Sequence, residues 1–514
     1  MFQNIYNLVK GLKNIFGIKS LLTIIQKNFN SNLSILEQET KWLELRSMIF
    51  ESGSLYIKFL QWYISKLKSN ILDTDTIETR NLSKFVAFFE DIFENCPFHS
   101  LDDTINIFIN EGGMIGIPMK NYIDMSTIRE IASGSIGQVY YARRKKDGLE
   151  VAIKVKHPDI VKNLEENKSV IRFISYLQSF QYIRKRYNLV FDIQDFLTDL
   201  QEQCDFNNEA NNCKKFRENF KDSSRFIIFP KIIFQSEDIL ISEYIHGHSF
   251  NELTPTQKNI TTLNFMCFFY QMLFVDNFIH GDLHCKNWKV RIHPETNSND
   301  GTIHSDNENT SNVQLIIYDC GICFKNIDAN TTRDFWFSLG KYDIPQLSSI
   351  LKKFIITSNE NISIENIEQE ISKLFQTILE NSVGTSMLMK SIINYFTSHN
   401  ILIHKFLLNF SITICLLEEF FRYNDVVNRE KTNTTNTVSM YDLINEGHMD
   451  IITFCKVKKS YPKVLEIFQS ELENKYNNYC NNIKNNNLNE NGKQIKPTLF
   501  NCLELSGLVM RPPE

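Results

Sequence analysis

The chain has 514 residues, of which 42% are hydrophobic, enough to fill more than one small domain. Its 55 basic and 60 acidic residues give a formal net charge of −5, which provides no basic stripe for a polyanion and excludes nucleic acid as an expected partner. The 11 cysteines are an odd number scattered along the chain. This argues against a disulfide framework and predicts an intracellular, reducing compartment.

The first segment, residues 1–48, is expected to be mostly helical. Ile5, Leu8 and Leu12 fall near one helical face, with lysines on the wetter one. Two interpretations stay open: an amphipathic helix packed on the core, or a membrane-surface or targeting helix. No apolar run is long enough to span a bilayer, so any membrane association is expected to be peripheral. Residues 49–125 are expected to add further helices.

Residues 126–245 carry the strongest chemical pattern. A short stretch has the spacing of a protein-kinase glycine-rich loop whose first glycine is replaced: Ala132, Gly134, Gly137 and Val139. Small residues there let backbone N–H groups approach phosphate oxygens. By itself this stretch is equally compatible with an ordinary turn. After a hairpin turn at 146–148, however, the sequence Val-Ala-Ile-Lys places Lys154 on the next strand, where kinases hold phosphates.

The same region is expected to contain two long helical segments, 164–187 and 192–212. It ends in an apolar stretch, 239–247, that is typical of the last small-lobe strand running into a hinge. A nucleotide base would stack at this hinge, so Glu243 is a candidate nucleotide-binding residue.

Residues 246–425 supply the remaining kinase parts in the expected order. An aspartate, Asp282, stands two residues after His280, and Asn287 stands five residues after the aspartate, as in a kinase catalytic loop. A buried-looking strand then ends at Asp319, a hard oxygen donor suited to magnesium.

Three other stretches of this half need an interpretation. The apolar run 263–274 contains Gln271 and is expected to be a buried core helix, not a membrane span. The polar residues 294–312 are predicted to be a disordered insertion between paired strands, and 426–514 a variable, Asn-rich region.

Two constellations suggest metals, but each has a simpler explanation. Cys320 and Cys323 have no second cysteine pair at zinc-like spacing, which favours two ordinary thiols. His280, His284 and Cys285 are better explained as catalytic-loop scaffolding than as zinc ligands.

Three motifs together resemble the UbiB/ADCK family of atypical protein-kinase-like proteins. The glycine-rich loop continues as Ser135-Ile-Gly-Gln138-Val, similar to the family's alanine-rich loop. Residues 205–212 are similar to its Asp-Phe-x-x-Glu-Ala-x-Asn, and Lys58 and Gln61 occupy the ends of its Lys-x-Gly-Gln. The third position of that last motif is Leu60, which puts tight packing of this helix over the pocket in question.

The resemblance implies an α+β, protein-kinase-like fold with two lobes, an N-terminal helical extension and a helix-rich C-terminal region. It implies ATP and Mg²⁺ as cofactors. Catalytic roles would fall to Asp282, Lys154 and its ion-pair partner Glu209, metal binding to Asn287 and Asp319, and regulation to Lys58 and Gln61. The implied nucleotide-binding residues are Ala132, Ser133, Gly134, Ser135, Gly137, Gln138, Val139, Lys154 and Glu243.

Gly134 stands where most relatives have alanine. It is expected to let the loop adopt positive φ, and so to change the preference between ATP and ADP.

The phosphate acceptor stays open between an unknown protein and a lipid, with a role in isoprenoid (quinone) metabolism at a membrane surface implied by the resemblance alone. Two rival functions remain. One is a small-molecule phosphotransferase of the aminoglycoside or choline kinase type, whose loop also has the His-Gly-Asp-Leu-His of residues 280–284. The other is a nucleotide-binding scaffold without catalysis.

Overall fold

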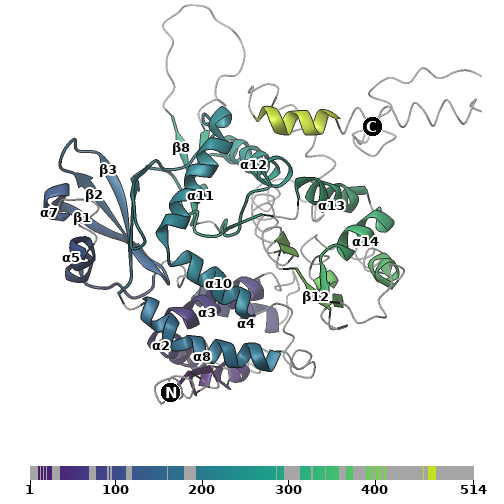
Figure 1. The fold of residues 1–514 in the computed structure, drawn as a ribbon, viewed down its shortest axis with the longest axis horizontal. Helices are drawn as coiled ribbons and strands as arrows, with labels where there is room; N and C mark the ends of the chain where they lie inside the picture. Colours follow the sequence, from purple (N-terminus) through teal and green to yellow (C-terminus); the bar gives the residue numbers. More distant parts are fainter. Residues whose placement is uncertain are drawn as a thin grey trace, which may run out of the picture. The chain divides into compact units, whose positions relative to one another are not determined.

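The computed structural model describes, apart from isolated positions, residues 10–25, 35–68, 77–110, 119–178, 193–293, 313–357, 366–373, short pieces within 389–411, residue 455 and residues 461–470 (Figure 1). The chain divides into two compact units. The first comprises residues 1–214, 230–245 and 320–322, and the second comprises residues 215–229, 246–319 and 323–514.

The first unit is built on a five-stranded antiparallel sheet (Figure 1). In spatial order its strands are β1 (Ile123–Ser133), β2 (Gly137–Arg144), β3 (Glu150–Lys156), β6 (Ile239–Glu243) and β5 (Ile232–Gln235). Gly148, at φ +69°, makes the predicted turn between β2 and β3. Buried side chains of the central strands pack with Phe108 of α5 (Leu101–Asn110) and Met119 of α7 (Met119–Tyr122).

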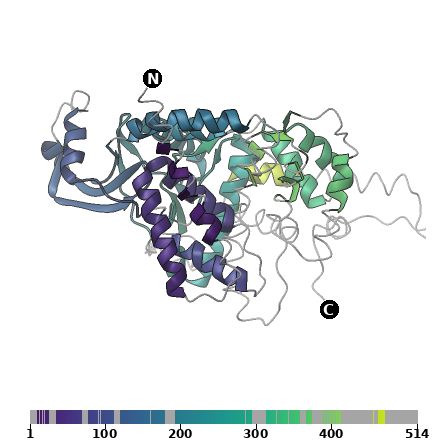
Figure 2. The ribbon, with the colours of Figure 1, turned by 90° about the horizontal axis from the view of Figure 1, so that it is seen from below.

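Helices form the rest of the first unit, and Figure 2 shows the earliest of them, in purple, side by side. They are α2 (Ile35–Ser52), α3 (Ser54–Lys68), α4 (Ile77–Phe89), α8 (Ile160–Gln178) and α10 (Ile193–Gln203). The first three enclose an apolar core in which the Trp42 and Phe85 ring centroids lie 5.6 Å apart. Gly53, at φ +100°, separates α2 from α3. The predicted face at Ile5, Leu8 and Leu12 lies outside the described residues.

The second unit combines short strands with helices. Its strands are β4 (Ile227–Ile228), β7 (Ile279–His280), β8 (Trp288–Ile292), β9 (Val313–Ile317), β10 (Cys323–Phe324), β11 (Ile355–Thr357) and β12 (Leu402–Ile403). Its helices include α12 (Pro255–Tyr270), α13 (Ala329–Lys341), α14 (Ile344–Lys352), a π-helical turn η4 (Gln271–Asp276), and the 3-10 turns η2 (Lys221–Ser223) and η3 (Phe250–Glu252).

Two predictions for this unit are confirmed. β8 and β9 pair antiparallel from Trp288–Ile317 to Ile292–Val313, so the polar insertion does separate paired strands, although residues 294–312 themselves lie outside the described residues. The apolar run 263–274 forms the second half of α12 and most of η4, and its side chains are almost all buried. Within the described part of the chain, no helix is both long and apolar enough to cross a bilayer.

The turn between β1 and β2 generates the first prediction. A Cβ atom at Gly137 would stand 2.5 Å from the Val155 carbonyl oxygen, closer than real Cβ atoms come to backbone. We expect Gly137→Ala to lower the free energy of unfolding, measured by urea denaturation, by about 1–3 kcal/mol because backbone must shift. Gly134→Ala, in the same turn but not at positive φ, is expected to cost less, and equal losses would contradict this account.

Candidate active site

The candidate phosphate-binding lysine lies in the middle of the first unit's sheet. Lys154 is on β3, opposite Val139 of β2 and Leu240 of β6. Its Nζ lies 2.7 Å from the Glu209 carboxylate, so the predicted ion pair is present. Both side chains are largely buried, and the Phe206 ring lies beneath the ammonium at 5.3 Å. A half-desolvated ammonium requires such a partner.

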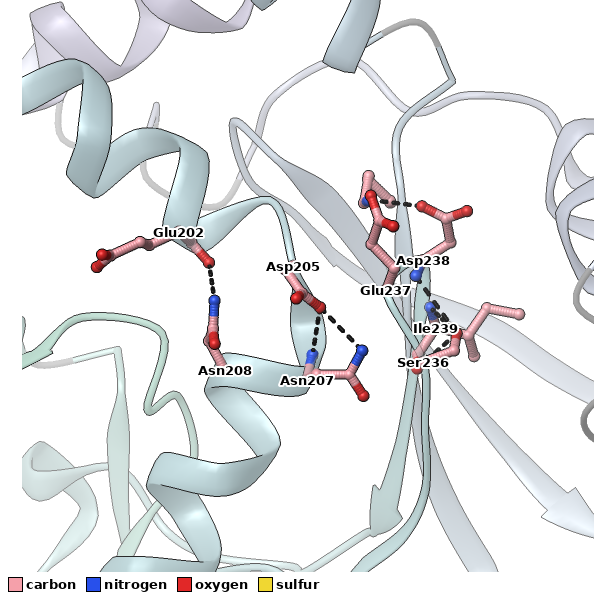
Figure 3. Close-up of polar contacts among 9 residues, drawn as sticks. Glu202, Asp205, Asn207, Asn208, Ser236, Glu237, Asp238 and Ile239 are labelled. Carbon is pink, nitrogen blue, oxygen red and sulfur yellow. Dashed lines mark hydrogen bonds and ion pairs between the residues drawn. The ribbon is translucent and has the colours of Figure 1, made fainter.

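A break in the helix sets the position of Glu209. The prediction of one helix over 192–212 is wrong, because α10 ends at Gln203 and α11 (Phe206–Asn219) begins after Asp205. The Asp205 carboxylate accepts hydrogen bonds from the Asn207 backbone N–H (3.0 Å) and side-chain amide (2.9 Å), which caps the new helix (Figure 3). Glu209 therefore stands in the first turn of α11, where the helix dipole favours a carboxylate.

The turn between β5 and β6 connects this helix start to the lysine strand. The Phe206 N–H donates to the Glu237 carbonyl (3.2 Å), and the Lys156 N–H donates to the Asp238 carbonyl (2.9 Å). Lys156, itself buried, also forms ion pairs with the carboxylates of Glu237 (3.2 Å) and Asp238 (2.5 Å). The turn between β5 and β6 thus bonds both to β3, which carries Lys154, and to the start of α11, which carries Glu209.

The glycine-rich loop is closed by the Gly134 N–H, which donates to the Gly137 carbonyl (3.0 Å). The expected positive φ at Gly134 is wrong: in the described residues the left-handed glycines are Gly53 and Gly148. From outside the turn, His157 holds the Gly134 carbonyl (3.0 Å) through its ring and the Ile136 carbonyl (2.9 Å) through its N–H, and the turn closes without that conformation. Positive φ at Gly134 therefore cannot be the cause of a change in nucleotide preference. Ala132, Ser135 and Val139 still lie in or beside the loop, as predicted.

Two side chains predicted to bind nucleotide are committed elsewhere. Gln138 is fully buried, and its amide accepts from the His99 N–H (2.8 Å) and donates to the His99 carbonyl (3.1 Å). Ser133 is also buried, and its hydroxyl donates to the Pro97 carbonyl (3.2 Å). In this structure both residues fasten the segment before α5 to the loop. Any contact of theirs with a nucleotide would have to use backbone atoms.

The helical extension contacts the same loop through α3. Gln61 is buried, donates to the Ile92 carbonyl (3.0 Å) and accepts from the Ser135 hydroxyl (3.5 Å). Leu60, which departs from the family motif, is buried in the helical core and does not prevent this contact. Lys58 is half-buried, and its charge acts on Cys204. Burial raises the pKa of that thiol to about 11, against the opposing charges of Lys156 and Lys58. Cys204 is therefore an unreactive thiol.

The catalytic-loop residues are held to one another in the second unit. The buried His280 donates from Nε2 to the Asp319 carbonyl and accepts from the Asp282 N–H at Nδ1 (3.1 Å). This pattern requires a neutral ring, and burial lowers the pKa of His280 accordingly, against the opposing effect of the Asp282 and Asp319 charges. The Asn287 amide donates to the Asp282 carbonyl (2.7 Å), and the Tyr318 N–H donates to the Asn287 carbonyl (3.0 Å). Asp282, Asn287 and Asp319 therefore belong to one hydrogen-bonded network.

Sequence reasoning missed one connection in the metal loop. Asn212, the last residue of the Asp-Phe-x-x-Glu-Ala-x-Asn match, donates to the Cys320 carbonyl (3.0 Å). The motif therefore positions two groups: Lys154 through Glu209, and the residue after Asp319 through Asn212. The asparagine at the end of the motif could have indicated the second contact. Cys320 and Cys323 are not joined in a disulfide, and the described residues contain no cluster suited to a zinc ion. Glu243 ends β6, with its N–H donating to the Lys231 carbonyl (2.9 Å).

The sheet, the lysine–glutamate pair and the catalytic loop together define a protein-kinase-like α+β domain. A family profile described as "ABC1 atypical kinase-like domain" matches residues 95–351. The chain belongs to this family, the UbiB/ADCK family that its motifs resemble.

Two curated relatives illustrate the likeness. The "Probable protein kinase UbiB" of Aliivibrio fischeri strain MJ11 is 29% identical over 216 residues, 40% of this chain and 37% of the relative. The "Probable serine/threonine-protein kinase abkC" of Dictyostelium discoideum is 29% identical over 271 residues, 51% of this chain and 36% of the relative. The matches thus span just over a third of each relative's length.

Solved structures overlap less closely. A complex of Rv3197 with erythromycin from Mycobacterium tuberculosis shares 20% identity at a TM-score of 0.36, covering 56% of this chain and 70% of that one. Rio2 kinase from Chaetomium thermophilum shares 12% identity at a TM-score of 0.28, covering 60% and 84%.

The buried ion pair generates the second prediction. Glu209→Gln leaves the Lys154 ammonium largely buried beside a neutral amide, and we expect it to lower the free energy of unfolding by about 1–3 kcal/mol in urea titrations. Glu218→Gln is the matched control, because Glu218 lies on the same helix in an exposed pair with Lys221 and should change stability little. Equal effects of the two substitutions would show that the buried pair is not structurally important.

Proposed function

We propose that the chain binds ATP with magnesium and transfers or hydrolyses the terminal phosphate. The 2.7 Å ion pair between Lys154 and Glu209 carries the proposal. A lysine held by a carboxylate on a sheet strand is oriented to attract the α- and β-phosphates. The adjoining loop, closed by Gly134 and Gly137, supplies backbone N–H groups beside that strand.

The residues present fit a magnesium ion. The carboxylate of Asp319 and the side-chain oxygen of Asn287 are hard donors of the kind magnesium prefers. Because the Asn287 nitrogen donates to the Asp282 carbonyl, the amide oxygen of Asn287 is the atom left for a cation. When bound, the ion would neutralise phosphate charge.

Asp282 is proposed to orient or deprotonate the attacking hydroxyl or water. Its backbone is fixed at both polar atoms, since its N–H donates to His280 and its carbonyl accepts from Asn287. Its carboxylate is partly exposed, with His284 Nε2 at 3.7 Å. A carboxylate on such a fixed backbone contributes mainly by positioning the acceptor.

The third prediction tests the metal ligand. Asp319→Asn keeps the shape of the side chain but removes its charge, so we expect magnesium-dependent ATP binding to be lost while the protein stays folded. Isothermal titration with Mg-ATP measures the loss, and circular dichroism checks the fold. Asp222→Asn, at an exposed aspartate of η2, is the matched control. Undiminished binding by Asp319→Asn would contradict the assignment.

The acceptor is proposed to be a protein or an isoprenoid lipid of quinone metabolism met at a membrane surface, on the strength of family membership. The described cysteines are free thiols, in keeping with a reducing, intracellular compartment. The sequence of the catalytic loop keeps a small-molecule acceptor as a second candidate.

The fourth prediction concerns turnover. ATP hydrolysis by the wild-type protein should exceed that of Asp319→Ala at least tenfold, as expected for loss of about 1.4 kcal/mol or more of transition-state stabilisation. Anionic lipid vesicles should raise the wild-type rate if the acceptor is met at a membrane. Equal rates for the two proteins would favour a scaffold without catalysis, and a rate insensitive to vesicles would count against the lipid surface.

A further inference from the structure

Residues 95–99, just before α5, are hydrogen-bonded to the glycine-rich loop at several points. The Cys96 N–H donates to the Ser133 carbonyl (2.8 Å), and Asn95 forms a parallel bridge with Ser133. His99 is held through its backbone by the Gln138 amide. The histidine rings of this neighbourhood take part in no step proposed above, yet they lie against the loop.

The tautomer of His157, which directly follows β3, is fixed by its contacts. Its Nε2 lies 3.0 Å from the Gly134 carbonyl oxygen. A carbonyl oxygen only accepts, so Nε2 must carry the proton. In the neutral ring Nδ1 is then an acceptor, and its partner is His99 Nδ1 at 2.8 Å. His99 must therefore donate.

The tautomer of His99 sets the direction of the next hydrogen bonds. With its proton on Nδ1, the Nε2 of His99 accepts from the Thr104 hydroxyl (2.8 Å). Thr104 in turn accepts from the Tyr140 hydroxyl (2.9 Å), and Tyr140 accepts from the side-chain amide of Gln138. Each neutral imidazole and each hydroxyl in this series has a single proton to donate, so the hydrogen bonds between them can run in only one direction.

We infer that His157 is a positioning residue for the nucleotide loop: its Nε2–H holds the Gly134 carbonyl, and His99 and Thr104 hold the ring in the tautomer that can do so. The inference rests on the proposed nucleotide binding and adds to it a connection between the loop and the segment ahead of α5. The side chains concerned come from the residues just before α5, from α5 and β2, and from the residue after β3, all within the first unit.

This arrangement makes the loop sensitive to acid. A proton added to either ring places two N–H groups against each other at the 2.8 Å contact between the Nδ1 atoms. Burial lowers the pKa of His99 to about 4, His157 adds to the lowering, and Asp103 opposes it. Burial also lowers the pKa of His157, against its bond to Gly134.

The charged groups facing the network are few among the described residues. Asp103 lies beside His99, and Asp103 and Glu130 act on Tyr140, whose pKa burial raises. Because the folded-state pKa values of both histidines lie below the ordinary value of about 6.5, the network is complete at neutral pH. Its contribution to stability is lost as pH falls from about 6.5 toward 4.

The test compares two substitutions of the same residue. His157→Leu removes the donor to Gly134, and we expect Mg-ATP affinity measured by isothermal titration to fall about tenfold, the effect of one hydrogen bond of 1.4 kcal/mol. His157→Gln can keep a donor in the Nε2 position and should retain affinity within about threefold of wild type. His399→Gln, at an exposed histidine of the second unit, is the matched control.

The pH profile separates positioning from a merely structural role. Phosphates of the nucleotide protonate in part of the same range, so the quantity read is the ratio of wild-type to His157→Gln affinity as pH falls from 7.5 to about 4, the folded-state pKa of His99. This ratio should fall about threefold or more as the histidines acquire protons that glutamine cannot. A constant ratio, or His157→Leu binding as tightly as wild type, would overturn the inference.

A measurement without nucleotide keeps the two proposals distinguishable. The ¹⁵N shifts of the imidazole nitrogens should show His157 protonated at Nε2 and His99 at Nδ1 at pH 7.5, and Thr104→Val should disturb His99 first. The opposite tautomers would refute the network even if ATP binds. Failure of the wild type to bind Mg-ATP, with these tautomers present, would refute the proposed function alone.

Discussion

The cost of burying an ammonium group explains much of the first unit's architecture. Lys154 lies on a central strand where water is largely excluded, and without Glu209 its charge would oppose folding. The chain ends α10 at Gln203 and starts α11 after Asp205, and this break places Glu209 in the first turn of α11, within reach of the ammonium. The turn at Glu237 and Asp238 then holds the strand and the helix start in register. Local irregularities in this unit thus follow from the burial of one charge.

The sequence predicted those parts in which chemistry and spacing coincide. These parts are the strand with Lys154, its partner Glu209, and the loop in which Asn287 bonds to Asp282. Their residue types occur in the order and at the spacing of a kinase. The buried strand before Asp319 was predictable because four of the five residues of β9 are apolar.

What the sequence could not supply depends on tertiary partners. Residues 192–212 have helical periodicity throughout. The break becomes understandable only from the tertiary structure, where the Phe206 N–H donates to the Glu237 carbonyl and not to a carbonyl of the preceding helix. The loop around Gly134 has the composition of a strained turn. It is held without positive φ by two hydrogen bonds, one from His157 to the Gly134 carbonyl and one from the Gly134 N–H to the Gly137 carbonyl. Gln138 matched a nucleotide motif, but its amide meets the backbone of His99, 39 positions away in sequence. Such long-range partners leave no local pattern.

The paired strands β8 and β9 have a consequence for how this chain tolerates change. Their last pair, Ile292 and Val313, brings the two ends of the intervening 20 residues together whatever that stretch contains. The entropy of closing a loop grows only with the logarithm of its length, roughly 0.6 kcal/mol for each doubling. Ladder hydrogen bonds and the buried side chains of β9 resist fraying at this point. The hairpin is therefore a suitable site for domain insertion. An unrelated domain whose own termini lie close together could be inserted between β8 and β9, and the catalytic loop that precedes β8 would keep its geometry.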